Sequence, residues 1–481
     1  MNVFSEAFAT HKSVVGTNNI AQLDSLSSSL RYPCSQRSGP SASIVLWRSA
    51  ITLDTASFNQ NFIIPSDIMT SPSLTAEEEI FKMCSEIKDV SKINIERCID
   101  SEYVINQRNQ KLHVHSYWPD ENNLLGIIVS LHGMGCHSNR PMQKYMATEF
   151  CSNGFAYVCL DFHGHGYSEG VRGLVQSPEY LVDDVLSLLR ALYPVSSSCM
   201  MDDSTPRKHK LNRQAGSTPF FLLGHSMGGS AAICVGQLLS DERMVTITKS
   251  KAERSISDYF RGCLLLCPAI DIVMPPAFVV AVLDYLVVPF FPHQPVPELF
   301  VARKSSDCLI WNNEAFQDYV SRDGYPANPN GLCYGDPVRF QTASTLVKLA
   351  AQLQRTLSKV QFPFIVFHDP TEQIVLVQGS ERLLEKSQTS PAHKSIVMVS
   401  DGLHDLLSNS FSFITEKSIE WLKSQMSMTA PVYRTTSVSS SESDLTDRKN
   451  TDICLSYYFV HLLLLVGIFI FTTFLSFLIV R

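Results

Sequence analysis

The pentapeptide Gly-His-Ser-Met-Gly at residues 224–228 is the feature that most constrains the fold of this chain. It follows the apolar run 220–223 and precedes a run of small and apolar residues, 230–239. This order predicts a strand, a tight turn and a helix, and the turn is so sharp that small residues must flank the serine. Such a turn lifts the Ser226 hydroxyl above the edge of a sheet, where it can attack a carbonyl group. A glycine-rich turn with a buried serine is the alternative interpretation.

Short apolar runs alternate with helical periods from about residue 93 onward. Leucine and valine recur on one helical face between Leu181 and Leu192, with Ser177 as the expected N-cap and Pro178 in the first turn. Strands that alternate with helices predict an α/β fold with a mostly parallel sheet, in which ligands bind beyond the C-terminal ends of the strands. The expected strands are 111–118, 126–131, 156–160, 220–223, 263–267, 362–367 and 395–399.

Composition argues against several classes of function. The chain of 481 residues has a net charge of −7 and no zinc-finger spacing or basic helix, so no nucleic-acid partner is expected. Cys263 and Cys267 have no second cysteine or histidine pair at zinc spacing, so no metal site is predicted. Four cysteines lie in apolar runs and are expected to be buried free thiols, namely Cys159, Cys234, Cys263 and Cys267.

Changes in composition divide the chain into expected regions. Residues 1–75 are serine-rich without periodicity and are expected to form a disordered extension. Residues 76–425 are expected to form the folded domain, with an inserted cap at about 273–357. A polar linker is expected over 426–452, followed by a transmembrane helix over 453–480.

The transmembrane prediction rests on residues 457–480, which contain no Asp, Glu, Lys or Arg. Tyr457 and Tyr458 are expected to anchor one interface, and Arg481 follows the other end. We expect a single C-terminal tail anchor in the endoplasmic reticulum or another organelle envelope, with the folded domain facing the cytosol.

A second apolar stretch, 278–288, is too short to span a bilayer and is interrupted by Asp284. The simplest expectation is a buried helix of the cap. A compatible alternative is that this helix lines an acyl tunnel or dips into a lipid surface.

In a serine hydrolase of this class of fold, the catalytic serine is followed in the sequence by the acid and then by the histidine. This order indicates where the other catalytic groups should lie. The segment His-Gly-Met-Gly at 132–135 follows the strand 126–131, so the N–H groups of Met134 and Met227 are the expected oxyanion hole. His404, after the last strand, is the expected base.

The acid that orients the base should follow the strand 362–367. The segment 368–375 offers two carboxylates, Asp369 and Glu372, and either would hold the imidazole tautomer and stabilise the imidazolium.

Two segments resemble those of monoacylglycerol lipases and the related plant-type lysophospholipases. Residues 132–140, HGMGCHSNR, look like the family's HGxGxHSxR segment, and residues 161–170, DFHGHGYSEG, resemble its DxxGHGxSxG loop. The resemblance runs from about residue 100 to 425. Further matching segments are 181–185, 224–229, 330–334 and 358–363.

This resemblance implies an α/β-hydrolase fold with a helical cap over an acyl pocket and no cofactor. It implies that Ser226 is the nucleophile and His404 the base. Relatives commonly read HGxxDxxV around the acid, which aligns Glu372 with the acid and favours it over Asp369.

The resemblance also bears on substrate binding. Gly133 belongs to the oxyanion loop, and Arg140 is expected either to bind a polar head group or to cap a surface. Cys136 replaces a residue that is polar or acidic in many relatives, so head-group preference is expected to differ.

The leading functional hypothesis is a membrane-anchored serine esterase that cleaves monoacylglycerols or lysophospholipids through an acyl-enzyme. One alternative is an acyltransferase or thioesterase that uses the same residues. Another is a catalytically inactive protein of the same fold that binds a lipid.

Overall fold

The computed structural model describes residues 99–194, 210–247, 255–297, 310–311, 314–335 and 337–427. The expected extension 1–75, almost all of the expected linker and the expected span 453–480 lie outside these ranges. Within them, no helix is both long enough and apolar enough to cross a membrane.

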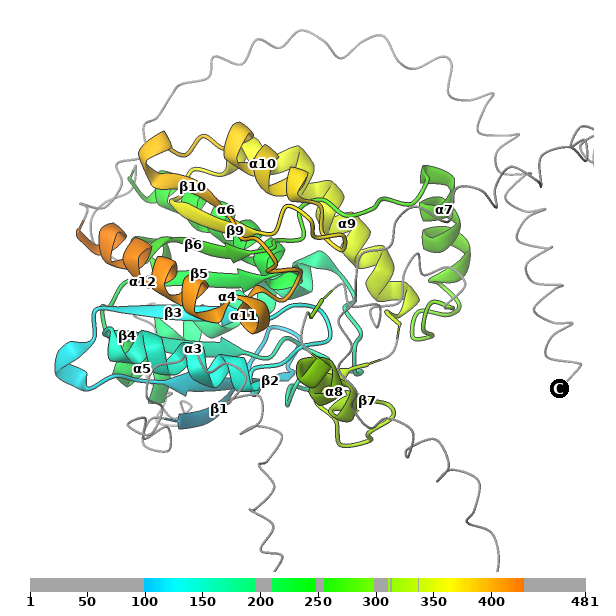
Figure 1. Ribbon diagram of the computed structural model, residues 1–481, viewed down its shortest axis with the longest axis horizontal. Helices are drawn as coiled ribbons and strands as arrows, with labels where there is room; N and C mark the ends of the chain where they lie inside the picture. The colour runs from blue at the N-terminus through cyan, green and yellow to red at the C-terminus, as the bar shows by residue number, and fades with distance from the viewer. Residues whose placement is uncertain are drawn as a thin grey trace, which may run out of the picture. The chain divides into compact units, whose positions relative to one another are not determined.

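An eight-stranded sheet forms the centre of the described domain (Figure 1), in the order β1-β2-β4-β3-β5-β6-β9-β10. The two pairs that involve β2 are antiparallel and the other five are parallel, so the prediction of a mostly parallel sheet is confirmed. The strands are β1 (Ile99–Ile105), β2 (Lys111–Tyr117), β3 (Gly126–Leu131), β4 (Phe155–Leu160), β5 (Phe220–His225), β6 (Phe260–Leu266), β9 (Phe364–His368) and β10 (Lys394–Met398).

Strands β3 and β4 are buried along their whole length, which explains why they read as continuous apolar runs. The edge strand β1 was not predicted. Tyr103 and Ile105 in β1 are exposed while Val104 is buried, so its sequence lacks a long apolar run.

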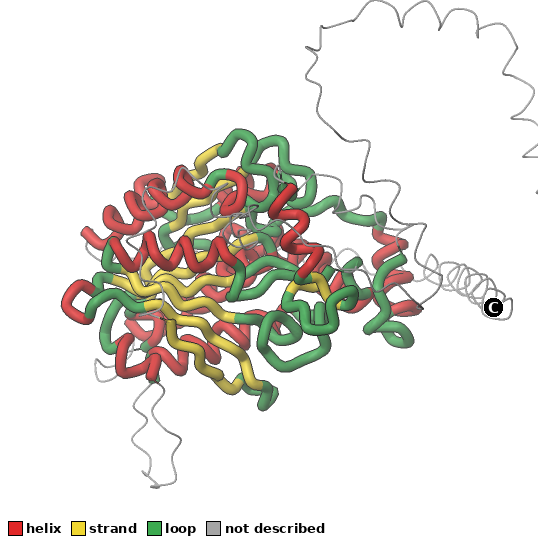
Figure 2. Tube along the Cα trace, turned by 60° about the horizontal axis from the view of Figure 1, so that its bottom comes forward, coloured by secondary structure: helices red, strands yellow, loops and turns green. Residues whose placement is uncertain are grey.

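Helices cover both faces of the sheet (Figures 1 and 2) and bury a separate apolar cluster on each. Helices α3 (Pro141–Ser152) and α12 (Phe411–Ser427) lie on one face. Helices on the other face are α4 (Pro178–Leu192), α6 (Met227–Ile247), α9 (Phe340–Thr356) and α10 (Val377–Lys386). Helix α4 begins and ends as predicted, although Ser177 makes no side-chain capping hydrogen bond.

The segment between β6 and β9 contains short elements before α9. They are α7 (Ala277–Val282), a π-helical turn η5 (Leu283–Val287), α8 (Glu314–Arg322), β7 (Gly324–Tyr325) and β8 (Cys333–Tyr334). Helix α9 itself places Leu349 and Leu353 in the main apolar cluster.

The expectation of a buried helix over 278–288 is wrong. Helix α7 and η5 contain no buried residue, and Phe278 and Tyr285 are 56% and 76% exposed. The physical reason is that Asp284 faces α9, where it accepts a hydrogen bond from Ser344 and pairs with Lys348 at 3.2 Å. Attachment through the polar residue leaves apolar side chains of this stretch exposed. Helix α7 lies to the right of α9 in Figure 1.

The cysteine prediction is confirmed for the described part of the chain. Its seven cysteines are all free, and Cys159, Cys234, Cys263 and Cys267 are buried.

Candidate active site

The predicted strand-turn-helix around Ser226 is present, between β5 and α6. Ser226 has a φ of 52°, a left-handed conformation that is strained for a residue with a side chain. Its N–H donates to Leu266 O at 2.9 Å and its carbonyl accepts from Ala269 N at 3.0 Å, so strand β6 and the loop after it hold the turn. A Cβ atom at Gly228 would lie 2.1 Å from Leu131 O, which explains the glycine there.

Ser226 and His404 line the same cavity, which has a volume of about 560 Å³. Both side chains are largely buried, with 8% and 7% of their surface exposed. The cavity is bounded by the oxyanion loop, by the segment around β7 and β8, and by α9. Apolar residues make up much of the wall, including Ile272, Ile310, Val320, Leu346, Leu349 and Val375.

The loop after β3 approaches Ser226 closely. A Cβ atom at Gly133 would lie 3.2 Å from Ser226 Cβ, so a larger residue would push the loop away. Met134 and Met227 both line the cavity. The Met227 N–H lies at the start of α6, where backbone N–H groups have no helical partner and are available to an anion.

His132 holds the loop after β3, the predicted oxyanion loop, through two hydrogen bonds. Its Nδ1 donates to Gly133 O at 2.8 Å and its Nε2 accepts from Phe162 N at 3.1 Å. Burial lowers the pKa of His132 to about 4, so the ring is neutral at pH 7 and this tautomer is retained.

The structure places Glu372 beside the His404 ring. Glu372 Oε1 lies 3.2 Å from His404 Nδ1 and accepts backbone hydrogen bonds from Ile374 at 2.6 Å and Val375 at 2.7 Å. The contact with His404 is close but is not aligned as a hydrogen bond, and Glu372 Oε2 lies 3.3 Å from His368 Nε2, also without an aligned hydrogen bond. Burial alone would raise the pKa of Glu372, but His404, His368 and the Val375 N–H outweigh it and lower the pKa well below its usual range. The carboxyl group is therefore ionised at pH 7.

The carboxylate of Asp369 accepts hydrogen bonds from groups other than the His404 ring. Its Oδ1 accepts from the N–H and the hydroxyl of Thr371, both at 2.7 Å, and its Oδ2 accepts from Leu403 N at 2.8 Å. Asp369 therefore joins two loops, and of the two candidate carboxylates it is Glu372 that reaches the His404 ring.

Arg140 is 7% exposed and lines the cavity near Cys136, to whose Sγ it donates at 3.2 Å. Its Nη2 also pairs with Asp405 Oδ2 at 3.1 Å. Asp405 accepts two further side-chain hydrogen bonds, from Trp311 and Ser408, each at 2.9 Å. Arg140 thus holds the residue next to His404 as well as facing the cavity.

Asp405 and His225 were missed by sequence reasoning. Burial alone would raise the pKa of Asp405, but the Arg140 guanidinium outweighs it and lowers the pKa to about 2. His225 Nε2 donates to His404 O at 2.9 Å and holds the backbone of that residue. Their positions directly beside Ser226 and His404 were the only sequence signal for either.

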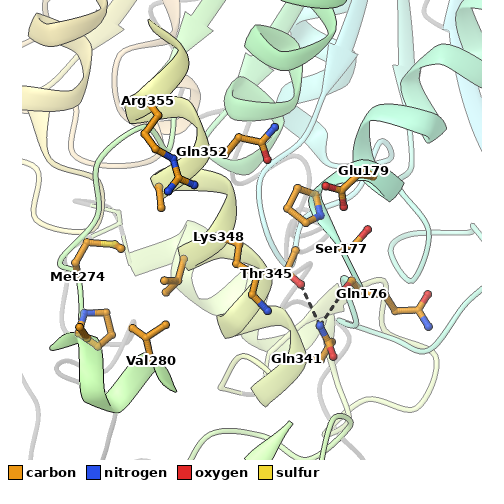
Figure 3. Close-up of a pocket in the computed structure, with 15 residues that line it drawn as sticks. Gln176, Ser177, Glu179, Met274, Val280, Gln341, Thr345, Lys348, Gln352 and Arg355 are labelled. Carbon is orange, nitrogen blue, oxygen red and sulfur yellow. Dashed lines mark hydrogen bonds between the residues drawn. The ribbon is translucent and has the colours of Figure 1, made fainter. Parts of the chain in front are cut away.

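A second cavity of about 540 Å³ lies on another side of α9 (Figure 3). Polar and charged residues of α9 face it at helical spacing, opposite the segment that leads into α4 and beside Met274 and Val280. None of the predicted catalytic residues lines it, whereas Ser226 and His404 line the first cavity. The facing residues of α9 are Gln341, Thr345, Lys348, Gln352 and Arg355.

Comparison with known proteins agrees with this geometry. Residues 122–410 match the family model described as serine aminopeptidase, S33. The mouse monoglyceride lipase is 24% identical over 311 residues, which cover 64% of this chain and 84% of the relative, and the human enzyme is 24% identical over 294 residues, which cover 60% and 79%.

Among solved structures, a soluble variant of monoglyceride lipase from Saccharomyces cerevisiae aligns with a TM-score of 0.50 at 17% identity. The alignment covers 70% of this chain and 99% of the yeast chain, and it supports the α/β-hydrolase fold. Because the family model spans more than half of the sequence, the chain belongs to the serine aminopeptidase S33 family and is a serine ester hydrolase similar to monoglyceride lipases.

Proposed function

We propose that this protein hydrolyses the ester bond of monoacylglycerols or lysophospholipids through an acyl-enzyme on Ser226. The observation that carries the proposal is that Ser226 and His404 line one largely apolar cavity, with Glu372 3.2 Å from the His404 ring. The named relatives that match most of their length are monoglyceride lipases, which favours a single-chain acylglycerol over other esters.

In the proposed first step, the Ser226 hydroxyl oxygen attacks the ester carbonyl and His404 Nε2 takes its proton. The ionised Glu372 beside Nδ1 keeps the proton of the neutral ring on that nitrogen and stabilises the imidazolium that forms. The Met134 and Met227 N–H groups donate to the developing oxyanion. His404 then protonates the leaving glycerol or lysolipid head.

In the second step, water enters beside His404, which removes a proton from it as it attacks the acyl carbonyl. The tetrahedral intermediate collapses, the proton returns to Ser226, and the fatty acid leaves. The apolar cavity wall supports this assignment, because an acyl chain gains about 0.8 kcal/mol for each methylene group that it buries.

The segment between β6 and β9 is proposed to act as the cap. Residues around β7 and β8 supply part of the cavity wall, and Tyr334 N donates to Gly135 O at 2.9 Å, which ties this segment to the oxyanion loop. Exposed apolar residues of α7 and η5 are suited to contact the lipid surface that holds the substrate.

Anchoring in a membrane, with the domain facing the cytosol, is part of the same proposal. It rests on the sequence 457–480, which carries no charged residue over a length that exceeds the ~20 residues needed to span a bilayer. An anchor would keep the enzyme at the surface where its substrate is dissolved.

The test is release of fatty acid from monoacylglycerol and lysophospholipid by the full chain in detergent, beside Ser226→Ala. We expect hydrolysis by the wild type and a loss of about a million-fold in the variant. Glycerol added as an alternative acceptor separates acyl transfer from hydrolysis. If the wild type turns over neither lipid and a fluorophosphonate probe does not label it, the lipid-binding alternative replaces this proposal.

A further inference from the structure

The side chains of Cys267 and Glu372 meet the ring of His404, although the three residues lie in different parts of the chain. Cys267 follows β6, Glu372 follows β9 and His404 follows β10. The Cys267 sulfur, a Glu372 carboxylate oxygen and a His404 ring nitrogen all lie within 4.8 Å of one another. All three residues are buried, and Cys267 is fully so. A thiol, a carboxylate and an imidazole are the ligand types that Zn²⁺ and softer divalent ions prefer.

Two polar atoms in this cluster have close neighbours but no aligned hydrogen bond. Glu372 Oε2 lies 3.3 Å from His368 Nε2, and His404 Nδ1 lies 3.2 Å from Glu372 Oε1, yet neither buried atom makes a hydrogen bond. Buried polar groups are nearly always hydrogen-bonded, and an exception indicates a functional group or an unfilled interaction. Neither atom is therefore committed to a hydrogen bond that a metal ion would have to break.

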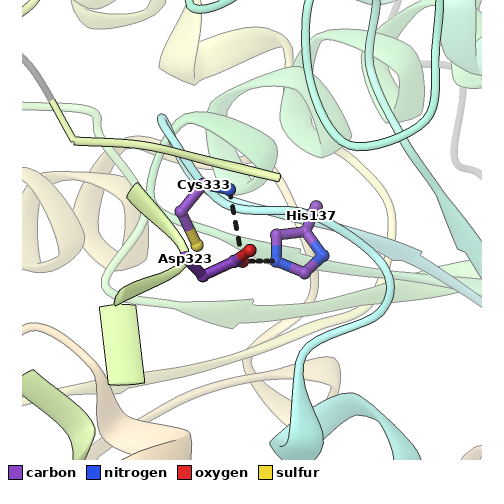
Figure 4. Close-up of side chains that lie close together, drawn as sticks. All are labelled: His137, Asp323 and Cys333. Carbon is purple, nitrogen blue, oxygen red and sulfur yellow. Dashed lines mark hydrogen bonds and ion pairs between the residues drawn. The ribbon is translucent and has the colours of Figure 1, made fainter. Parts of the chain in front are cut away.

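A second cluster also contains one histidine, one carboxylate and one cysteine, but its polar groups are hydrogen-bonded. His137, Asp323 and Cys333 also lie within 4.8 Å of one another (Figure 4). Here His137 Nδ1 accepts from Asn139 N at 3.1 Å, so Nε2 carries the proton and donates to Asp323 Oδ2 at 2.9 Å. Leu332 N also donates to Asp323. A metal on Nε2 would need that proton removed while Nδ1 still faces an N–H donor, so we assign this cluster to hydrogen bonding between the oxyanion loop and the segment around β8.

We propose that Cys267, Glu372 and His404 form an inhibitory site for a soft divalent cation, of which Zn²⁺ and Cd²⁺ are the representatives. The inference rests on the proposed function, because inhibition acts through the proposed base. The bound ion is no cofactor of the hydrolysis. Sequence spacing gave no sign of this site, because Glu372, the ligand nearest to Cys267 in the sequence, follows it by more than 100 residues.

The chemistry of binding accounts for inhibition. The Cys267 thiol loses its proton to solvent and the sulfur binds the ion. His404 binds through Nδ1, so its single ring proton moves to Nε2. A ring protonated at Nε2 cannot accept the proton of Ser226, and Glu372 becomes a ligand of the ion rather than a partner of the ring.

The distances require a small contraction. Bond lengths of about 2.3 Å to sulfur and about 2.0 Å to nitrogen place tetrahedral ligands about 3.3–3.7 Å apart. Glu372 Oε1 already lies 3.2 Å from His404 Nδ1, and Oε2 makes no hydrogen bond, so a small rotation of the carboxylate and a movement of Cys267 bring the ligands to that spacing. The fourth ligand is a water molecule that enters with the ion.

The first test measures binding without activity. Full-length Ser226→Ala is titrated with Cd²⁺ while the sulfur-to-cadmium charge-transfer absorption is followed in the ultraviolet. We expect Ser226→Ala/Cys267→Ala to lose one equivalent of this signal, whereas Ser226→Ala/Cys333→Ala, which removes an equally buried thiol of the second cluster, keeps it. Loss with Cys333→Ala and not with Cys267→Ala would overturn the assignment.

The second test measures inhibition. Zn²⁺ is expected to inhibit wild-type hydrolysis reversibly on addition of a chelator, and Cys267→Ala is expected to keep hydrolysis while its inhibition constant rises at least about tenfold. Equal sensitivity of the two proteins overturns the proposal. If Cys267→Ala does not fold, Cys267→Ser serves the same purpose, since a neutral hydroxyl is a poor ligand for Cd²⁺. A wild type without hydrolysis defeats the proposed function, while the Cd²⁺ titration still decides the site.

Discussion

Two buried carboxylates flank His404, and their surroundings differ. Asp405 Oδ2 accepts hydrogen bonds from Arg140, Trp311 and Ser408, and Oδ1 accepts from Ser408 N at 3.3 Å, so both oxygens are engaged away from the ring. Glu372 Oε1 accepts from two backbone N–H groups and lies 3.2 Å from the His404 ring, and Oε2 lies 3.3 Å from His368 Nε2 without an aligned hydrogen bond. Asp405 therefore holds the loop, whereas Glu372 is the carboxylate placed to respond when the ring gains or loses a proton.

The largest effect is expected at Glu372. Glu372→Gln keeps the size of the side chain but removes the charge that stabilises the imidazolium, so kcat for ester hydrolysis is expected to fall about 10⁴-fold. Asp369→Asn is the matched control, because Asp369 only joins two loops, and its kcat is expected to change less than about tenfold. Reversed magnitudes in steady-state assays would show that the acid is Asp369.

Replacement of Asp405 tests the other side of the comparison. Asp405→Ala leaves the Arg140 guanidinium buried without its partner, which is expected to lower the free energy of unfolding by about 3–5 kcal/mol. Urea denaturation measures this change. The double variant Arg140→Met/Asp405→Ala should recover part of the loss, and a double variant that is less stable than Asp405→Ala alone would contradict the pairing.

The parts of the candidate site that are local could be predicted from the sequence. The strand, turn and helix around Ser226, the glycines on either side of Met134 and the position of His404 all depend on neighbouring residues. The Arg140–Asp405 pair joins residues 265 positions apart, so no local pattern could reveal it.

The same limit explains the errors of the fold prediction. The apolar stretch 278–288 looked like a core helix, because its sequence does not show that Asp284 is the residue attached to α9. The strand β1 was missed because only one of its faces meets the domain.

A smaller effect is expected when the oxyanion loop is displaced. In Gly133→Ala the new methyl group would lie 3.0 Å from His225 Nδ1 and 3.2 Å from Ser226 Cβ, so the loop must retreat and carry the Met134 N–H with it. We expect kcat/KM to fall about 10²-fold with little change in stability. Gly216→Ala is the control outside the cavity: a Cβ atom there has nothing within 4 Å, so its φ of 54° is expected to cost stability but to leave kcat/KM unchanged. An unchanged kcat/KM would remove Met134 from the oxyanion hole.

The smallest effect concerns pH. The pKa of Asp405 is about 2 in the folded chain, below its ordinary value of 3.8, so the unfolded chain binds this proton first as the pH falls. The stabilisation is fully present above about pH 4 and is lost as the pH falls through about 2, a change of roughly 2 kcal/mol. The difference in the free energy of unfolding between the wild type and Asp405→Asn, measured with urea, should become smaller as the pH falls from about 4 to about 2. A difference that stays constant would show that the charge of Asp405 contributes nothing.

The central claim is that Ser226 is the nucleophile and that His404 and Glu372 activate it. The most direct measurement is the rate at which a fluorophosphonate ester labels the full chain, followed by mapping of the modified peptide. We expect one label per chain on Ser226, no label in Ser226→Ala, and much slower labelling in Glu372→Gln than in Asp369→Asn. Labelling of another residue, or equal rates in the two carboxylate variants, would contradict it.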